Sequence, residues 1–210
     1  VVLELSSFQL EDLGPHGLSP HAAVVTNVSP NHLDRHGSMA AYIDAKKNIF
    51  RFQGPDDLAV LNADDPEVRS WAEETPGRVL LYSLEEPVEA GAFLDGGEAV
   101  LRVAEAEERM DLAGTLRLRG RHNLANALAA AVAARALGTP AEEILAAAAA
   151  FEPLPHRFQP VGTVAGVQYI DDSKATTPRS AVVAMEALEE PVVLIAGGYD
   201  KHLDPSPLVE

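Results

Sequence analysis

Two polar stretches near the start of the chain carry side chains that could hold a metal ion. ELSSFQLE places Glu4 directly after three apolar residues and adds Ser6 and Gln9, and TNVSPNHLDRHG at 26–37 contributes His32. A carboxylate with one imidazole is an oxygen-rich set that suits Mg²⁺ better than Zn²⁺, and the HExxH spacing of zinc proteases is absent. A solvent-facing Glu4 on an edge strand and a surface His32 are the alternatives.

A lysine on the apolar side of a predicted helix could act as a reactive amine. In AYIDAKKNIF, Tyr42, Lys46 and Phe50 share one helical face. Burial disfavours the ammonium ion and lowers the pKa of a lysine. A neutral amine can combine with CO₂ to give a carbamate, which is an anionic oxygen ligand for a metal. The alternatives are that Lys46 extends to solvent, or that Lys47 takes its place on the apolar face.

The stretch GRHNLANALAA opens a predicted helix with polar side chains in its first turns. Asn123 and Asn126 stand three residues apart and therefore share a helical face. Together they could hydrogen-bond a nucleotide base or ribose. The alternative is that they cap the helix N-terminus.

Two later stretches place charged and hydroxyl groups where a strand ends. YIDDSKATTPRS supplies Asp172, Lys174 and Thr176 between a predicted strand and a predicted helix, and Lys201 follows a glycine pair in VVLIAGGYDKHLD. The carboxyl ends of strands and the amino ends of helices are where α/β proteins bind anionic ligands. A plain tight turn is the alternative at Lys201.

The elements that must position these residues alternate between strand and helix. Apolar runs of strand length occur at 1–5, 22–28, 58–61, 79–82, 167–170 and 192–196. Helical spacing occurs at 40–52 and 123–137, and Thr177-Pro178 predicts the N-cap and first residue of a helix that continues over 181–188. This alternation predicts an α/β fold with a mainly parallel sheet flanked by helices. The stretch 84–118, rich in Gly and Glu, predicts antiparallel strands or hairpins.

Proline marks the predicted division of the chain. FEPLPHRFQPVG interrupts an alanine-rich helical stretch, so we expect one domain over 1–153 and a second, Rossmann-like one over 154–210. The first residues read as a strand from the middle of a domain, and the second domain stops after one strand–helix–strand unit. We therefore expect a piece of a longer protein, cut at both ends.

Composition limits the classes of partner. The chain has 16 Lys and Arg against 32 Asp and Glu, a formal net charge of −16, and no cysteine. The negative charge argues against nucleic acid and anionic membrane as partners, and no stretch is long and apolar enough to insert in a membrane. The lack of cysteine and of a secretory signal pattern fits the cytoplasm. No GxxxxGK[ST] phosphate-binding loop occurs.

Eight short stretches, in order, resemble the Mur ligases of bacterial cell-wall synthesis. They are ELSSFQLE, TNVSPNHLDRHGS, YIDAKKNIF, LNADDP, GRHNLANALAA, LPHRF, DDSKATTP and GGYDK. ELSSFQL and DSKAT are closest to the members that add D-glutamate to UDP-N-acetylmuramoyl-L-alanine. The resemblance implies an ATP-dependent ligase in peptidoglycan synthesis that acts through an acyl-phosphate, in the cytoplasm and as a monomer.

The resemblance also implies roles for individual residues. Glu4 and His32 would hold Mg²⁺, with a carbamylated Lys46 supporting a second ion. The ATP-binding residues would be Asn123, Asn126, Arg157, Asp172 and Lys174. Ser6 and Gln9 would contact the muramoyl-alanine substrate, and Thr176 and Lys201 would face D-glutamate, while His156 would support its neighbour.

Some parts that the resemblance implies are not among these 210 residues. The N-terminal UDP-binding domain and the phosphate loop are expected before Val1, and further glutamate-contacting residues after Glu210. Two other functions stay open: another amino-acid ligase of the family, including a folate-directed one, and a binding module without catalysis. The DSKAT stretch argues against the first.

Overall fold

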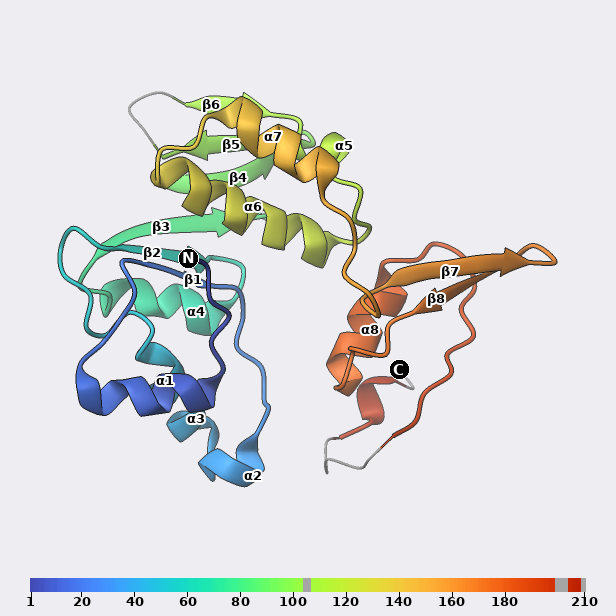
Figure 1. Ribbon diagram of the computed structural model, residues 1–210, viewed down its shortest axis with the longest axis horizontal. Coiled ribbons are helices and arrows are strands. Elements are labelled where there is room, and N and C mark those ends of the chain that lie inside the picture. Colours follow the sequence, from blue (N-terminus) through green and yellow to red (C-terminus); the bar gives the residue numbers. More distant parts are fainter. Residues whose placement is uncertain (104–106, 199–203, 209–210) are drawn as a thin grey trace.

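The computed structural model describes residues 1–103, 107–198 and 204–208 (Figure 1). The α-helices are α1 (Ser7–Leu13), α2 (Leu33–His36), α3 (Met39–Lys47), α4 (Pro66–Ser70), α5 (Leu112–Thr115), α6 (Arg121–Ala136), α7 (Ala141–Ala150) and α8 (Pro178–Glu186). The strands are β1 (Ala22–Val25), β2 (Leu58–Asn62), β3 (Arg78–Ser83), β4 (Gly91–Asp95), β5 (Glu98–Arg102), β6 (Glu108–Met110), β7 (Gln159–Val164) and β8 (Val167–Asp171). Short 3₁₀ turns follow α1 and α4, and another lies at Ser206–Leu208.

A six-stranded sheet forms the centre of the first part of the chain. Its strands follow the order β1-β2-β3-β4-β5-β6. The first three pairings are parallel and the last two are antiparallel. The α/β class with a mainly parallel sheet is therefore confirmed, as are the antiparallel strands expected within 84–118.

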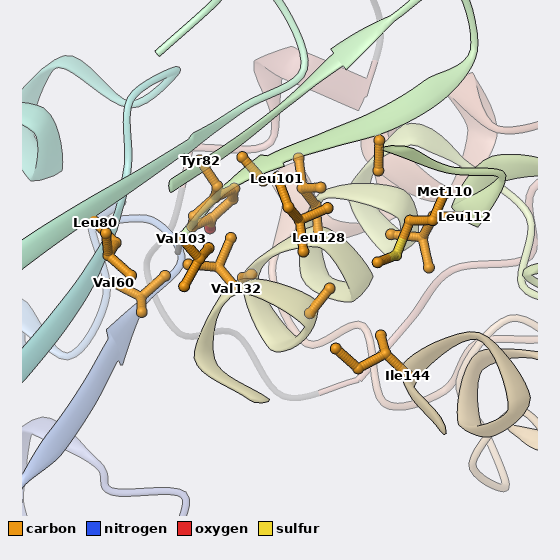
Figure 2. Close-up of a cluster of buried hydrophobic side chains, with 14 of the residues drawn as sticks. Val60, Leu80, Tyr82, Leu101, Val103, Met110, Leu112, Leu128, Val132 and Ile144 are labelled. Carbon is orange, nitrogen blue, oxygen red and sulfur yellow. The ribbon is translucent and has the colours of Figure 1, made fainter. Parts of the chain in front are cut away.

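Alternating side chains on the central strands build one apolar core on each face of the sheet, because successive residues of a strand point to opposite sides. Val60, Leu80 and Tyr82 pack with α6, α5 and α7 on one face, where Figure 2 shows the buried side chains. Leu61 and its neighbours pack on the other face with α4, Phe50 and Trp71. The sheet is thus covered on both sides and holds the carboxyl ends of β1, β2 and β3 in a fixed layer.

The later part of the chain forms a separate small sheet. Strands β7 and β8 pair as an antiparallel hairpin, and α8 follows β8. The predicted cap of α8 is confirmed, since the side chain of Thr177 accepts a hydrogen bond from the Ser180 amide and Pro178 opens the helix. The strand predicted over 192–196 is not formed: Val193 and Ile195 are 91% exposed, and no strand of the described residues pairs with this stretch.

The strand predicted over 1–5 is also wrong. Residues 1–5 have no regular structure, and the side chains of Val1, Val2 and Leu3 are exposed to solvent. Strand β1 pairs only with β2 among the described strands, and residues 1–5 do not add a strand to its other edge. Glu4 therefore lies just ahead of α1 and not at the end of a strand. Within the described residues, no helix has the length and apolar character needed to cross a membrane.

Candidate active site

The ELSSFQL stretch forms the start of α1 through a reciprocal capping box. The Ser6 hydroxyl oxygen accepts a hydrogen bond from the Gln9 amide at 3.3 Å, while the Ser6 amide donates to Gln9 Oε1 at 2.8 Å. Each side chain thereby satisfies a backbone N–H that the helix itself leaves without a partner. Ser6 and Gln9 are consequently held by one another at the exposed end of α1, next to Glu4, which is also exposed.

His32 is the N-cap of the short helix α2 and has an unusual backbone conformation. Its φ of 54° lies in the left-handed region, and Gly37 ends the helix with a φ of 75°. A left-handed residue other than glycine costs roughly 1–2 kcal/mol, and a helix of one turn is not stable by itself. Contacts from other elements must therefore hold α2. The His32 side chain is exposed.

Four rings from α1, α2 and α3 form an aromatic cluster (Phe8, His32, His36 and Tyr42). The Phe8 ring meets His32 edge-on at 4.9 Å and stacks on His36 at 5.5 Å and 14°. His36 in turn meets the Tyr42 ring edge-on at 5.4 Å. Sequence reasoning assigned no role to Phe8 or His36; the signal was the recurrence of aromatic and histidine residues in three neighbouring polar stretches.

Lys46 extends this cluster on α3. Its Nζ lies 5.1 Å from the centre of the Tyr42 ring, and burial lowers the pKa of the amine. Lys47 points elsewhere: its Nζ forms an ion pair with Glu74 at 2.6 Å and lies over Trp71. Lys46 is therefore half-buried, and Lys47 is covered as well, with 16% of its side chain exposed. A lysine with a lowered pKa is more readily neutral and reactive.

Few side chains around the aromatic cluster could ligate a metal ion. Among the described residues, no three His, Cys, Asp or Glu side chains come together as a metal site. Mg²⁺ usually keeps several waters and takes one or two protein ligands besides substrate phosphates.

The predicted nucleotide-binding residues of α6 lie where this helix begins. Asn123 donates from Nδ2 to the Arg119 carbonyl at 2.7 Å, so its side chain has a local structural partner, and Asn126 is exposed. Gly120 precedes the helix with a φ of 94°, and a Cβ at this position would lie 2.9 Å from the Ala187 Cβ. The start of α6 thus lies against the segment that follows α8.

The loop after β8 is fixed by hydrogen bonds to the LPHRF stretch. Asp171 Oδ2 lies 2.7 Å from His156 Nδ1, and Asp172 Oδ1 accepts from the Phe158 amide at 2.9 Å. The Lys174 amide donates to the His156 carbonyl at 3.1 Å. Two of the predicted segments, 154–158 and 171–176, are therefore brought together. The predicted site residues Arg157, Lys174 and Thr176 are exposed there.

The starts of α6 and of the loop after β8 are also within electrostatic range. Burial lowers the pKa of His122, and the negative charge of Asp172 opposes this shift. The Asp172 carboxylate is thus near enough to the start of α6 to act on His122, the neighbour of Asn123 in the sequence. Lys201, predicted to face D-glutamate, lies outside the described residues.

Comparison with known proteins identifies the family. A family model described as the Mur ligase middle domain matches residues 1–134. The chain belongs to the Mur ligase family. The UDP-N-acetylmuramoylalanine–D-glutamate ligase of Symbiobacterium thermophilum is 45% identical over 210 residues, covering 99% of this chain and 46% of that protein. The protein of the same name from Roseiflexus sp. is 44% identical, covering 97% of this chain and 45% of its own length. This Mur ligase chain therefore spans about half the length of the curated relatives it matches.

Solved Mur ligases share the fold. MurF from Acinetobacter baumannii is 21% identical with a TM-score of 0.66, covering 87% of this chain and 39% of that one. The MurF ligase from Thermotoga maritima in complex with ADP is also 21% identical, with a TM-score of 0.63, covering 88% of this chain and 42% of that one. At these identities, the likeness establishes the common fold.

One anchor of the site in this Mur ligase chain was missed from the sequence. Asp65 caps α4 through Oδ1, which accepts from the Glu67 and Val68 amides at 3.0 and 3.1 Å. Its Oδ2 accepts from the Val28 amide at 2.9 Å, and Asn62 Nδ2 donates to the Thr26 carbonyl at 2.7 Å. Both bonds hold the segment that leads from β1 to His32. An Asp directly before Pro was the signal, since the pair is typical of a helix start.

We expect the Asp65→Ala variant to lose about 1–3 kcal/mol of the free energy of unfolding, because three backbone amides lose their acceptor. Urea denaturation would measure this. Asp65→Asn is the matched control: it keeps one oxygen for the α4 cap but cannot accept from Val28, so its denaturation midpoint should lie between those of Asp65→Ala and the unchanged protein. Equal midpoints for all three proteins would contradict the assignment.

The Asp171 carboxylate should report its contact with His156 in an acid titration. This hydrogen bond, helped by those from Ser173, lowers the pKa of Asp171 from 3.8 to about 2. A lowered pKa in the folded state stabilises the protein above the unfolded pKa, and the contribution disappears as the pH falls from 3.8 through about 2. The Ser173 amide, which donates to Asp171 Oδ1, should titrate near the lower value by NMR.

The His156→Phe variant is the control for this titration, and its Ser173 amide should titrate closer to the ordinary carboxyl value. A midpoint at the ordinary value in the unchanged protein would show that the His156–Asp171 contact is not kept in solution.

Proposed function

We propose that this chain is part of an ATP-dependent ligase that joins D-glutamate to UDP-N-acetylmuramoyl-L-alanine in peptidoglycan precursor synthesis. The observation that carries the proposal is the 45% identity, over 99% of the chain, to a relative named for this ligase activity. By complete ligase we mean a polypeptide of the relatives' length that contains these 210 residues. In it, residues 1–153 would belong to the central ATP-binding domain and 154–210 to an amino-acid-binding domain.

The proposed reaction has two steps that balance. A carboxylate oxygen of UDP-N-acetylmuramoyl-L-alanine attacks the γ-phosphorus of ATP, the bond to the bridging oxygen breaks, and ADP leaves. The amine of D-glutamate then attacks the acyl carbon to give a tetrahedral intermediate, the C–O bond to phosphate breaks, and the amine loses its proton. Phosphoryl transfer of this kind depends on positioning and charge stabilisation and needs no protein nucleophile.

We propose that Mg²⁺ is held by Glu4 and His32, with a carbamylated Lys46 supporting a second ion. Two features support this: the exposure of Glu4 and His32, and the half-buried amine of Lys46 with its lowered pKa. Bound Mg²⁺ would neutralise negative charge on the phosphates. Lys46 would contribute the anionic oxygen that its carbamate carries, while Glu4 and His32 would supply an oxygen and a nitrogen ligand.

The remaining site residues would bind the three substrates. For ATP we propose Asn123, Asn126, Arg157, Asp172 and Lys174; for the muramoyl-alanine part Ser6 and Gln9; and for D-glutamate Thr176 and Lys201. The electrostatic link between Asp172 and α6 supports a shared nucleotide site. We further propose a cytoplasmic monomer that binds neither nucleic acid nor membrane, in keeping with the net charge of −16 and the lack of cysteine.

The test is ADP release by the complete ligase with a panel of amino acids. The proposal predicts release only when UDP-N-acetylmuramoyl-L-alanine and D-glutamate are both present, and background release with L-lysine or diaminopimelate. Equal turnover with those amino acids would overturn the substrate assignment. No release with any substrate would favour a binding module without catalysis.

A further inference from the structure

His36 occupies the centre of the aromatic cluster but has no place among the proposed ligands. It joins all three helices of the region. Its Nε2 lies 3.0 Å from the Ser7 hydroxyl on α1, its ring stacks on Phe8 of the same helix, and it meets Tyr42 of α3. Ser7 is only 3% exposed, so this contact also satisfies a hydroxyl that would otherwise be buried without a partner.

His36 is connected to two of the proposed metal-site residues through the rings beside it. On one side, His36 stacks on Phe8, whose ring touches His32 at 4.9 Å. On the other side, it touches Tyr42, whose ring lies 5.1 Å from Lys46 Nζ. One ring therefore separates His36 from each ligand. Helix α2 has a single turn, with left-handed residues at both ends, and depends on such contacts to stay in place.

We propose that His36 is a positioning residue: it holds α2 between α1 and α3 and thereby sets His32 and Lys46 at the separation that the reaction needs. It touches neither substrate nor metal. The inference rests on the proposed function for its catalytic meaning, although the packing role stands without it. Each contact acts through a different part of the ring, so the hydrogen bond and the stacking can be separated by substitution.

Three substitutions divide these contacts in the complete ligase. His36→Phe keeps the ring contacts and loses the hydrogen bond to Ser7, His36→Gln keeps a hydrogen-bonding group near Nε2 and loses the ring, and His36→Ala loses both.

We expect kcat to fall roughly 10- to 100-fold in His36→Ala, the effect of a misplaced site, and by a smaller factor in His36→Phe and His36→Gln. The KM for D-glutamate should change less than about twofold. The half-saturating Mg²⁺ concentration should rise with the fall in kcat. His16→Ala, at an exposed histidine, is the matched control.

A second readout does not depend on activity. The rate of amine labelling at one fixed pH, followed by mass spectrometry, reports how well the Lys46 amine is covered, and Lys47 on the same helix is the internal reference. In His36→Ala the Lys46 amine should be labelled faster, because the cover beside the Tyr42 ring loosens, while Lys47 keeps its labelling profile. Circular dichroism would establish that the variant is folded.

The outcomes separate this inference from the proposed function. If the unchanged ligase does not use D-glutamate, the proposed function fails, and the labelling still decides the role of His36. His36 is not a positioning residue if His36→Ala has the same Lys46 labelling as the unchanged ligase and, where that ligase is active, the same kcat and Mg²⁺ dependence. A fall in kcat with unchanged Mg²⁺ dependence and labelling would also overturn it.

Discussion

Replacing Lys46 with alanine is expected to lower the kcat of the complete ligase by roughly 10²- to 10³-fold, the usual effect of removing one group that stabilises transition-state charge. The amine lies half-buried beside Tyr42, and burial lowers its pKa. If it carries a carbamate, alanine removes an anionic oxygen ligand. Steady-state ADP release would measure the loss.

Two experiments separate the carbamate from a simple positive charge at Lys46. Lys46→Arg keeps a cation that stays protonated and cannot form a carbamate, so it should be as impaired as Lys46→Ala. A short carboxylate such as acetate, which can occupy the vacated space, should partly restore Lys46→Ala but not Lys46→Arg. An arginine variant with full activity would contradict the carbamate.

Removing the imidazole of His32 should have the second-largest effect. We expect His32→Gly to raise the half-saturating Mg²⁺ concentration by roughly 10- to 100-fold, as loss of groups that support a metal commonly does. Glycine is the informative substitution because the φ of 54° at this position suits it without strain, so the result reports the side chain and not the backbone.

A titration of ADP release against Mg²⁺ would measure the effect of His32→Gly. His32→Asn is the companion variant, because asparagine also tolerates the left-handed region and keeps a polar group. Its half-saturating Mg²⁺ concentration should lie between those of the unchanged ligase and His32→Gly. An unchanged requirement in His32→Gly would remove His32 from the metal site.

The central sheet could be predicted because its strands are long apolar runs bounded by turns. Each of the runs at 22–28, 58–61 and 79–82 contains or overlaps a strand of the structure. The same reasoning failed for 1–5 and 192–196, which are equally apolar. A strand forms only where its backbone pairs with a neighbouring strand. Apolar composition does not record that pairing, and residues 1–5 do not pair with β1 even though β1 is an edge strand.

The candidate site could be predicted only in part. Spacing alone places Lys46 on the helical face of Tyr42, but it left open whether Lys46 or Lys47 is the covered lysine, and the structure covers both in part. The contacts that join α1, α2 and α3 could not be predicted, because Ser7 and His36 are 29 residues apart and local sequence patterns do not reveal such contacts. The left-handed backbone of His32 was equally hidden, because histidine is enriched in this region but most histidines lie outside it.

The most direct test of the proposed chemistry uses UDP-N-acetylmuramoyl-L-alanine labelled with ¹⁸O in both carboxylate oxygens. The complete ligase, ATP, Mg²⁺ and D-glutamate are added, and the products are analysed by mass spectrometry. Ligation through an acyl-phosphate predicts one ¹⁸O in the released phosphate and one in the new amide, because the C–O bond breaks when the amine displaces phosphate. Phosphate without the label, or an amide with an amino acid other than D-glutamate, would contradict the account.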